Sequence, residues 1–204
     1  EKSSLKLVGD RYQLTQRQRL AVMRASCSDN QLKKRKASQV TFEQICSRRV
    51  VIDGYNLLIT IETALSGGVI LKCRDGCCRD LAGIHGTYRK VAETVPALKI
   101  TADILKESGA QQALWLLDRP VSNSGRLSKL IEQTGSECGC SWKARLTDSP
   151  DRELAETGDI IITADSAVID RCTGWLDLSR IIAESRIPNA WLIEISSRDS
   201  FFCK

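Results

Sequence analysis

Aspartates follow three short apolar runs of the sequence, each at the end of its run or just past it. They are Asp53 after VVI, Asp118 after LWLL and Asp165 after IIITA. A single aspartate in such a place is ordinary helix-capping chemistry, because a carboxylate accepts hydrogen bonds from the first N–H groups of a helix. Three aspartates in equivalent places indicate one shared site.

Carboxylates that crowd together repel each other, so a divalent cation or basic neighbours must keep them ionised. Oxygen ligands that leave room for bound water suit Mg²⁺ or Mn²⁺. A further acidic group precedes the third apolar run and comprises Asp148, Asp151 and Glu153. We expect Asp151 to be the fourth ligand, and Asp148 is the alternative.

A Ser-Asn-Ser-Gly stretch follows the second aspartate and is expected to open a helix. Hydroxyl groups and free backbone N–H groups at a helix start can bind a phosphate, and Arg119 and Arg126 lie beside this stretch. The alternative is ordinary capping by the same residue types. On the first interpretation, the phosphate contacts are Ser122, Asn123, Ser124 and Arg126.

Several other kinds of chemistry have little support in the sequence. His85 is the single histidine and lies between glycines, so we expect a packed or surface histidine and no histidine metal site or nucleophile triad. No GxGxxG follows the first apolar run, and no GxxxxGKS or GxxxxGKT occurs, which disfavours dinucleotide and P-loop chemistry. Asp53 is followed by Gly-Tyr and not by a second aspartate two residues on, which argues against a phosphatase of the haloacid dehalogenase type.

After Arg49, apolar runs without polar alternation take turns with helical patterns. Such runs are typical of parallel strands covered on both faces, so we expect a three-layer α/β fold around a mainly parallel sheet. The carboxyl ends of parallel strands lie along one edge of a sheet, where distant aspartates can meet. The expected strands are Val50–Ile52, Ala113–Leu117, Ile160–Ile162 and Ala190–Ile195. The expected helices are Leu81–Val91, Ala97–Leu105 ended by Gly109, one that starts over Gly125–Ile131 and is ended by Gly135, and Glu153–Thr157, with a turn at Ser66–Gly68.

The chain has 204 residues, of which 42% are hydrophobic, enough for one main core with a short extension. It contains no run of about 18 apolar residues that could span a bilayer and no secretory signal, so we expect a cytoplasmic protein without membrane contact. The nine cysteines are odd in number and irregularly spaced, unlike a secreted disulfide framework. We expect reduced, packed thiols, and the alternatives are one disulfide or a thiolate metal site from Cys73, Cys77, Cys78, Cys138 and Cys140.

The charge of the chain is unevenly distributed. Residues 1–49 have a net charge of +8, whereas the remainder has a net charge of −3. A basic segment joined to a mildly acidic domain indicates attraction to a polyanion such as nucleic acid, and a solvated surface segment is the alternative. Within this segment we expect a basic helix over Leu14–Cys27 with Thr15 as its N-cap, a KKRK run at residues 33–36, and Phe42 and Ile45 as anchors to the main domain.

The segment IDGYNLL, residues 52–58, resembles the first-strand signature of PIN-like nucleases of the NYN branch, especially YacP-type RNA endonucleases. In those proteins a strand ending in Asp-Gly-Tyr-Asn is followed by a strand ending in Asp, an acidic helix start, and a strand ending in Thr-x-Asp. The whole chain is also similar to an archaeal family that joins a short basic helical segment, here residues 1–47, to a PIN-like domain, here residues 48–204. The matching positions are Asp53 with Asn56, Asp118, Asp151 and Asp165.

The resemblance implies a central sheet of PIN type and an endoribonuclease that hydrolyses RNA phosphodiester bonds with Mg²⁺ or Mn²⁺. Asp53, Asp118 and Asp165 would be the central ligands, and Asn56 would orient a water or a phosphate. The connection between the last two acids is shorter than in YacP-type proteins, so Asp80 competes for the fourth place unless it pairs with Arg79 or Arg89.

If RNA is the substrate, the basic segment is expected to contact its phosphates, and Tyr12 or Tyr55 to stack on its bases. PIN-like domains include members that bind RNA without cleaving it, so a non-catalytic RNA-binding or ribosome-associated protein is the alternative function. A small-molecule phosphohydrolase is a third hypothesis, and the sequence leaves the choice between monomer and homodimer open. The predicted phosphate contacts of the basic segment are Arg17, Arg19, Lys34 and Arg35, with Lys33 and Lys36 beside them.

Overall fold

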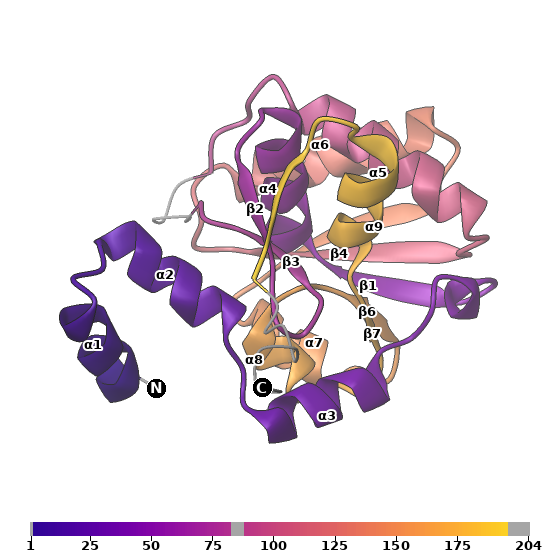
Figure 1. Ribbon diagram of the computed structural model, residues 1–204. Helices are drawn as coiled ribbons and strands as arrows, with labels where there is room; N and C mark the ends of the chain where they lie inside the picture. The colour runs from indigo at the N-terminus through magenta and orange to yellow at the C-terminus, as the bar shows by residue number, and fades with distance from the viewer. Residues whose placement is uncertain (1, 83–87, 196–204) are drawn as a thin grey trace.

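Five short strands pair in parallel and form the central sheet of the computed structural model, which describes residues 2–82 and 88–195. The order across the sheet is β5-β4-β1-β6-β7, so the chain extends from β1 toward both edges (Figure 1). The predicted α/β fold with a parallel sheet is confirmed. The strands are β1 (Arg49–Asp53), β4 (Gln112–Asp118), β5 (Trp142–Thr147), β6 (Ile160–Ile162) and β7 (Trp175–Leu176).

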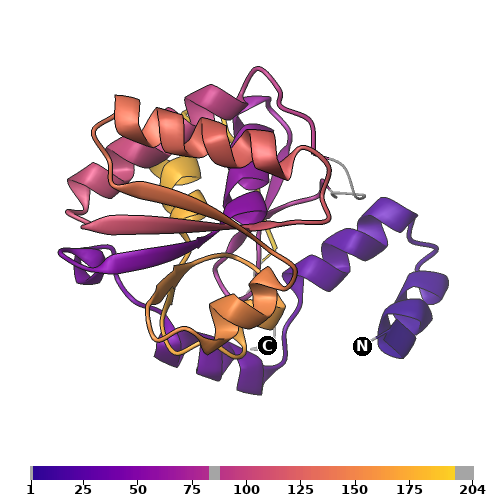
Figure 2. The same cartoon turned by 180° about the vertical axis from the view of Figure 1, so that it is seen from behind.

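Side chains alternate along each strand between the two faces of the sheet, and each face has its own apolar core. Val50 and Ile52 of β1 point into one core, whereas Val51 points into the other. Helices therefore cover the sheet on both sides (Figures 1 and 2). The first face is covered by α4 (Gly54–Leu65), α5 (Thr94–Glu107), α6 (Ser124–Glu137) and α9 (Leu178–Arg186), and the second by α7 (Pro150–Glu156) and α8 (Ser166–Ile169).

The N-terminal segment forms three helices, α1 (Lys2–Arg11), α2 (Gln16–Ala25) and α3 (Asp29–Ser38). The predicted N-cap of α2 is confirmed, because the side chain of Thr15 accepts from Gln18 in a reciprocal capping box. The predicted anchor Ile45 is fully buried, and Phe42 packs against the same core. Helix α3 lies along the second face of the sheet, where Trp175 donates its indole N–H to the backbone carbonyl of Arg35 (Figure 2).

A smaller sheet of three strands lies beside the main one, in the order β3-β2-β8. It consists of β2 (Val69–Lys72), β3 (Cys78–Asp80) and β8 (Trp191–Glu194). The sequence predicts a strand at β8, but its assignment to the covered parallel sheet is wrong. Trp191 is 58% exposed and Ile193 is 38% exposed, since β8 forms the edge of the small sheet and only one neighbour, β2, pairs with it.

Two helix predictions need correction. Residues 81–82, directly after β3, and residues 88–91 belong to no helix. The middle of the predicted helix, including His85, lies outside the described residues. Gly109 follows α5 with a positive φ of 71° as expected, but Gly135 lies inside α6 and does not end it. A Cβ atom on Gly135 would lie 2.8 Å from the Cβ of Trp142, so this glycine lets the helix approach β5.

The cysteines among the described residues are all free thiols. Cys73, Cys77, Cys78 and Cys172 are buried, which agrees with the prediction of packed, reduced residues. Burial raises the pKa of each of these thiols, so they remain protonated at neutral pH. Within residues 2–82 and 88–195, no helix has the length and apolar character needed to cross a membrane.

Candidate active site

Four aspartates lie along the carboxyl edge of the central sheet. Asp53 ends β1, Asp118 ends β4, Asp151 lies in the first turn of α7 after β5, and Asp165 follows β6 by three residues. The strands β5, β4, β1 and β6 are neighbours in the sheet, so these four positions lie along one edge. Asp53 pairs in register with Leu116, two residues before Asp118, and both carboxylates therefore project from the face that α7 and α8 cover.

The carboxyl group of Asp53 is the most perturbed of the four. Burial is the largest cause, and together with the negative charges of Asp165 and Asp151 it raises the pKa of Asp53 to about 7. Hydrogen bonds from the hydroxyl of Thr163, at 2.9 Å, and from the backbone N–H of Asn56 oppose this shift without cancelling it. In the absence of a cation, Asp53 is therefore about half protonated at neutral pH.

Asp151 connects the other members of the cluster electrostatically. Burial and the charge of Asp151 raise the pKa of Asp118, and burial and the charge of Asp165 raise the pKa of Asp151, which Arg171 partly offsets. Asp148, the alternative fourth acid, is exposed and pairs with Arg119 at 3.2 Å. Between the two predicted choices, only Asp151 is electrostatically coupled to the other three carboxylates.

Thr163 fixes two of the four aspartates and is absent from the predicted site residues. Its hydroxyl donates to Asp53 and accepts from the backbone N–H of Asp165 at 3.0 Å. Asp165 in turn caps α8, accepting from the N–H groups of Ala167 and Val168 at 2.7 and 3.0 Å. The Thr-x-Asp spacing at the end of β6 was the available signal, because a hydroxyl two residues before an aspartate can bind its backbone N–H.

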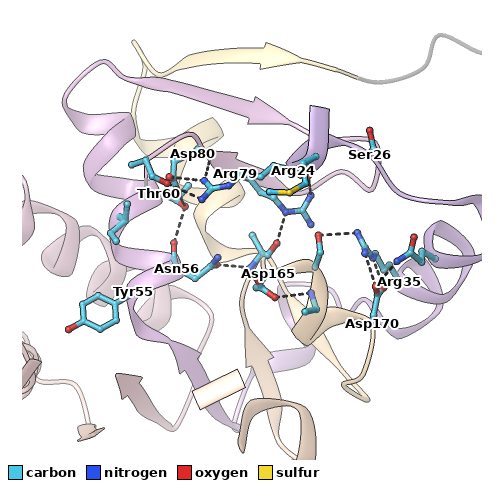
Figure 3. Close-up of a pocket in the computed structure, with 17 residues that line it drawn as sticks. Arg24, Ser26, Arg35, Tyr55, Asn56, Thr60, Arg79, Asp80, Asp165 and Asp170 are labelled. Atoms are coloured by element: carbon cyan, nitrogen blue, oxygen red, sulfur yellow. Dashed lines mark hydrogen bonds and ion pairs between the residues drawn. The ribbon is translucent and has the colours of Figure 1, made fainter. Parts of the chain in front are cut away.

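The backbone of Ala164 is held by hydrogen bonds at both its N–H and its carbonyl group. The side-chain carbonyl of Asn56, in the first turn of α4, accepts from the N–H of Ala164 at 2.8 Å, and Arg79 donates from Nε to its carbonyl at 2.6 Å (Figure 3). Arg79 also donates to the carbonyl of Arg24 at 3.0 Å. The loop that carries Asp165 is thus tied to the end of α2.

A cavity of 530 Å³, which we call the α2 cavity, opens beside Asp165 and Asn56 (Figure 3). Residues of α2, α3, α4, β3 and α8 form its walls. Asp80 lies in this wall, where it accepts from Arg24 at 3.1 Å and from Thr60 at 3.0 Å. Its ion-pair partner is therefore Arg24 and neither Arg79 nor Arg89, which corrects the prediction. The charge of Asp80 is also not among the causes of the raised pKa values of Asp53, Asp118 and Asp151.

The Ser-Asn-Ser-Gly stretch opens α6 as predicted, but part of it is unavailable to a phosphate. Ser124 is buried, and its hydroxyl donates to the backbone carbonyl of Asp118 at 2.6 Å and bonds the Tyr55 hydroxyl at 2.7 Å. Asn123 donates from Nδ2 to the carbonyl of Tyr88 at 3.0 Å. Of the four predicted phosphate contacts, Ser122 and Arg126 are exposed and form no side-chain hydrogen bond with a described residue.

Only part of the basic N-terminal segment is docked onto the domain: α3 lies against it, whereas α1 and the first part of α2 project from it (Figures 1 and 2). Arg35 is 2% exposed and lies between Asp75 at 2.5 Å and Asp170 at 2.7 Å, so it is a structural residue of the fold and not an RNA contact. Lys34 donates to the carbonyl of Asp170. Arg19 binds Asp10 at 2.8 Å and so joins α2 to α1, while Arg17 is exposed.

Across residues 2–82 and 88–195, no group of three histidine, cysteine, aspartate or glutamate side chains is arranged so that it could hold a metal ion. The four aspartates supply only oxygen donors, and Arg171 is the one cation that lowers a pKa among them. Such a donor set fits hard cations such as Mg²⁺ or Mn²⁺, which retain several waters and are often held by one or two carboxylates.

Comparisons with known proteins cover nearly the whole chain. Residues 42–181 match a family described as Domain of unknown function (DUF5616), and residues 1–37 match one described as Protein of unknown function (DUF434). The chain is also similar to the uncharacterized protein MJ0935 of the archaeon Methanocaldococcus jannaschii, with 28% identity over 166 residues, which are 81% of this chain and 79% of that protein. No solved structure matches the chain. Because the first of these matches spans more than half of its length, the chain belongs to the family described as Domain of unknown function (DUF5616).

Proposed function

We propose that this protein is a metal-dependent endoribonuclease that hydrolyses RNA phosphodiester bonds at the aspartate cluster. The observation that carries the proposal is the coupling of four carboxylates, from the ends of four neighbouring strands, in one partly buried site. Negative charge gathered in this way is costly to a fold unless a cation or a proton compensates it. The resemblance of the IDGYN segment to NYN-type nucleases supports the same reaction.

Asp53, Asp118 and Asp165 would hold the ion, with Asp151 as the fourth acid. A bound Mg²⁺ or Mn²⁺ would activate a water molecule and neutralise charge that develops on the phosphate. The protein itself contributes the orientation of these groups: Thr163 fixes the carboxyl of Asp53, and the Ala164 peptide bonds hold the loop of Asp165.

The test is cleavage of a mixed pool of structured and single-stranded RNAs during titration with Mn²⁺ and Mg²⁺. We compare the wild type with the Asp53→Asn/Asp165→Asn double variant, in which the amides keep the acceptor oxygens for Thr163 and for the first turn of α8. Asp148→Asn is the matched control, because Asp148 is an exposed acid near the same edge but outside the cluster.

We expect metal-dependent cleavage by the wild type and by the control, and a loss of at least about a hundredfold in the double variant. Circular dichroism and thermal unfolding establish that the variant is folded. Equal cleavage by the folded double variant would exclude the aspartate cluster as the catalytic site.

A non-catalytic RNA-binding protein is the second candidate. It is favoured by the lack of three converging ligands among the described side chains, since a binding domain needs no ion at this edge. If RNA binds equally well to the wild type and to the double variant, and is not cleaved at any metal concentration, this second function is supported and the nuclease is not.

A further inference from the structure

A second cavity, which we call the α6 cavity, lies between the first half of α6 and residues 88–90. Its volume is 520 Å³, within the range of roughly 300–1,000 Å³ that ligand pockets occupy. Leu127 and Leu130 contribute apolar surface. None of the described residues that line it is acidic, and its four cationic residues are Arg89, Lys90, Arg126 and Lys129.

These four cations differ from those of the α2 cavity. There, Arg24, Arg35 and Arg79 each bind an aspartate. In contrast, none of the four cations of the α6 cavity forms an ion pair with an acidic residue in the part of the chain that the structure describes. Four like charges around one hollow repel each other, and a bound polyanion would relieve that repulsion.

The α6 cavity adjoins the aspartate cluster through two bonded contacts. Asn123 donates to the backbone carbonyl of Tyr88 and so joins the two sides of the cavity. The next residue, Ser124, donates to the backbone carbonyl of Asp118, the last residue of β4. The ring of Tyr88 also lies 5.4 Å from the ring of Tyr55, which bonds Ser124. The α6 cavity therefore lies beside the end of β4, at the edge of the sheet where Asp118 is located.

We infer that the α6 cavity binds the sugar-phosphate backbone of the RNA strand on the Asp118 side of the scissile bond. The inference rests on the proposed RNA substrate, and it assigns backbone recognition to the domain itself and not to the basic N-terminal segment. Arginine and lysine at a nucleic acid backbone supply affinity and position without reading the base sequence. Binding at this site accordingly depends on charge and on salt, and little on RNA sequence.

The experiment measures RNA binding in EDTA, where no metal-dependent cleavage can occur. The probe is a fluorescein-labelled single-stranded RNA of about 12 nucleotides, followed by fluorescence anisotropy at several salt concentrations. The test variant carries Arg89→Gln, Lys90→Gln, Arg126→Gln and Lys129→Gln. The matched control removes the same charge from exposed cations near the amino ends of the strands, with Arg48→Gln, Lys106→Gln, Lys143→Gln and Arg186→Gln.

We expect the test variant to bind RNA at least about tenfold more weakly than the control. The slope of log K against log salt, which is negative, should become less steep by about 2 to 3, since each phosphate contact with a single strand contributes about 0.7 to its magnitude. A third variant, with Arg and Lys exchanged at all four positions, should retain binding, because it keeps the charge.

Three outcomes separate this inference from the proposed function. Weaker binding by the test variant supports the α6 cavity even if the wild type never cleaves RNA. If the test variant binds RNA as tightly as the wild type, and the wild type cleaves RNA, the inference about the α6 cavity is wrong and the proposed nuclease function is retained. Equal loss of binding in both variants shows a general charge effect and also overturns it.

Discussion

At the scale of single residues, Asp53 combines a place in the proposed active site with a cost to the stability of the fold. Its pKa rises from an ordinary value near 4 to about 7, so between pH 4 and pH 7 the folded protein holds a proton that the unfolded chain has released. The contribution of Asp53 to the stability of the metal-free protein therefore falls as pH rises through this window and levels off above it, because the folded state holds the proton on this carboxyl.

The Asp53→Asn variant removes this pH dependence. In EDTA at pH 8, we expect its unfolding free energy to exceed that of the wild type by up to about 4 kcal/mol, since the pKa of Asp53 rises from near 4 to about 7 and each pKa unit corresponds to about 1.4 kcal/mol. At pH 4 the two proteins should differ little. Thermal unfolding across this pH range measures the difference, and Asp148→Asn serves as the exposed control. A wild type that is the more stable protein at pH 8 would show that Asp53 is not a strained, buried carboxyl.

The same reasoning predicts how a cation acts. Mn²⁺ should raise the melting temperature of the wild type, because a ligand that binds only the folded state stabilises it, and should have a smaller effect on Asp53→Asn. Such an ion would offset the negative charge of Asp53, whose burial lowers the stability of the metal-free protein.

At the scale of elements, helix α3 is held by a buried charge network and not by an apolar face. Arg35 bridges Asp75, in the turn between β2 and β3, and Asp170, after α8. Arg79 shares Asp75 at 2.7 Å. Burial lowers the ability of water to screen these charges, and the paired guanidinium groups hold the pKa of Asp75 below its usual value despite the opposing effect of burial.

Arg35→Ala should therefore destabilise the protein by about 3 kcal/mol, because it leaves two carboxylates without their shared partner while Arg79 still compensates one of them. Lys36→Ala, the exposed neighbour on the same helix, should change stability by less than about 0.5 kcal/mol. Urea unfolding gives both values. Equal midpoints for the two variants would mean that α3 is not required for the fold.

Within the central sheet, the sequence predicted the strands whose apolar runs are uninterrupted and missed the two edge strands, β5 and β7. It also missed β2 of the small sheet, although β2 begins with the apolar run VIL. β1, β4 and β6 read VVI, ALWLL and III, whereas β5 reads WKARLT and lies at the edge of the sheet. An edge strand has one neighbour and more exposure, so its sequence loses the signature of a covered strand. β7 has two residues, too few for any periodic pattern.

At the scale of the whole molecule, the predicted aspartates lie along one edge because parallel strands bring their carboxyl ends there. The apolar runs of the sequence predict parallel strands, so this placement could be predicted as well. The role of Arg35 could not be predicted in the same way. Its partners Asp75 and Asp170 lie 40 and 135 residues away, and the basic run around it is as typical of an RNA contact as of a docked helix.

Truncation from the N-terminus distinguishes docked from peripheral helices. Removal of residues 1–13 takes away α1, which packs mainly on α2, and should lower the melting temperature by only a few degrees. Removal of residues 1–40 also takes away Arg35 and the cover of Trp175, and should leave a protein that unfolds readily or aggregates. Thermal unfolding of both truncated chains measures this. A stable, monomeric chain lacking residues 1–40 would contradict it.

The contacts of α3 also set an order on synthesis. Trp175 is 140 residues from the Arg35 carbonyl that it binds, so the helix leaves the ribosome long before its partners exist. The nascent chain must carry its most basic segment undocked until residues 166–177 emerge, while β1, β4 and the helices between them can already assemble. Helix α3, made before the segments that it binds, is thus among the last of the described elements to be fixed in place.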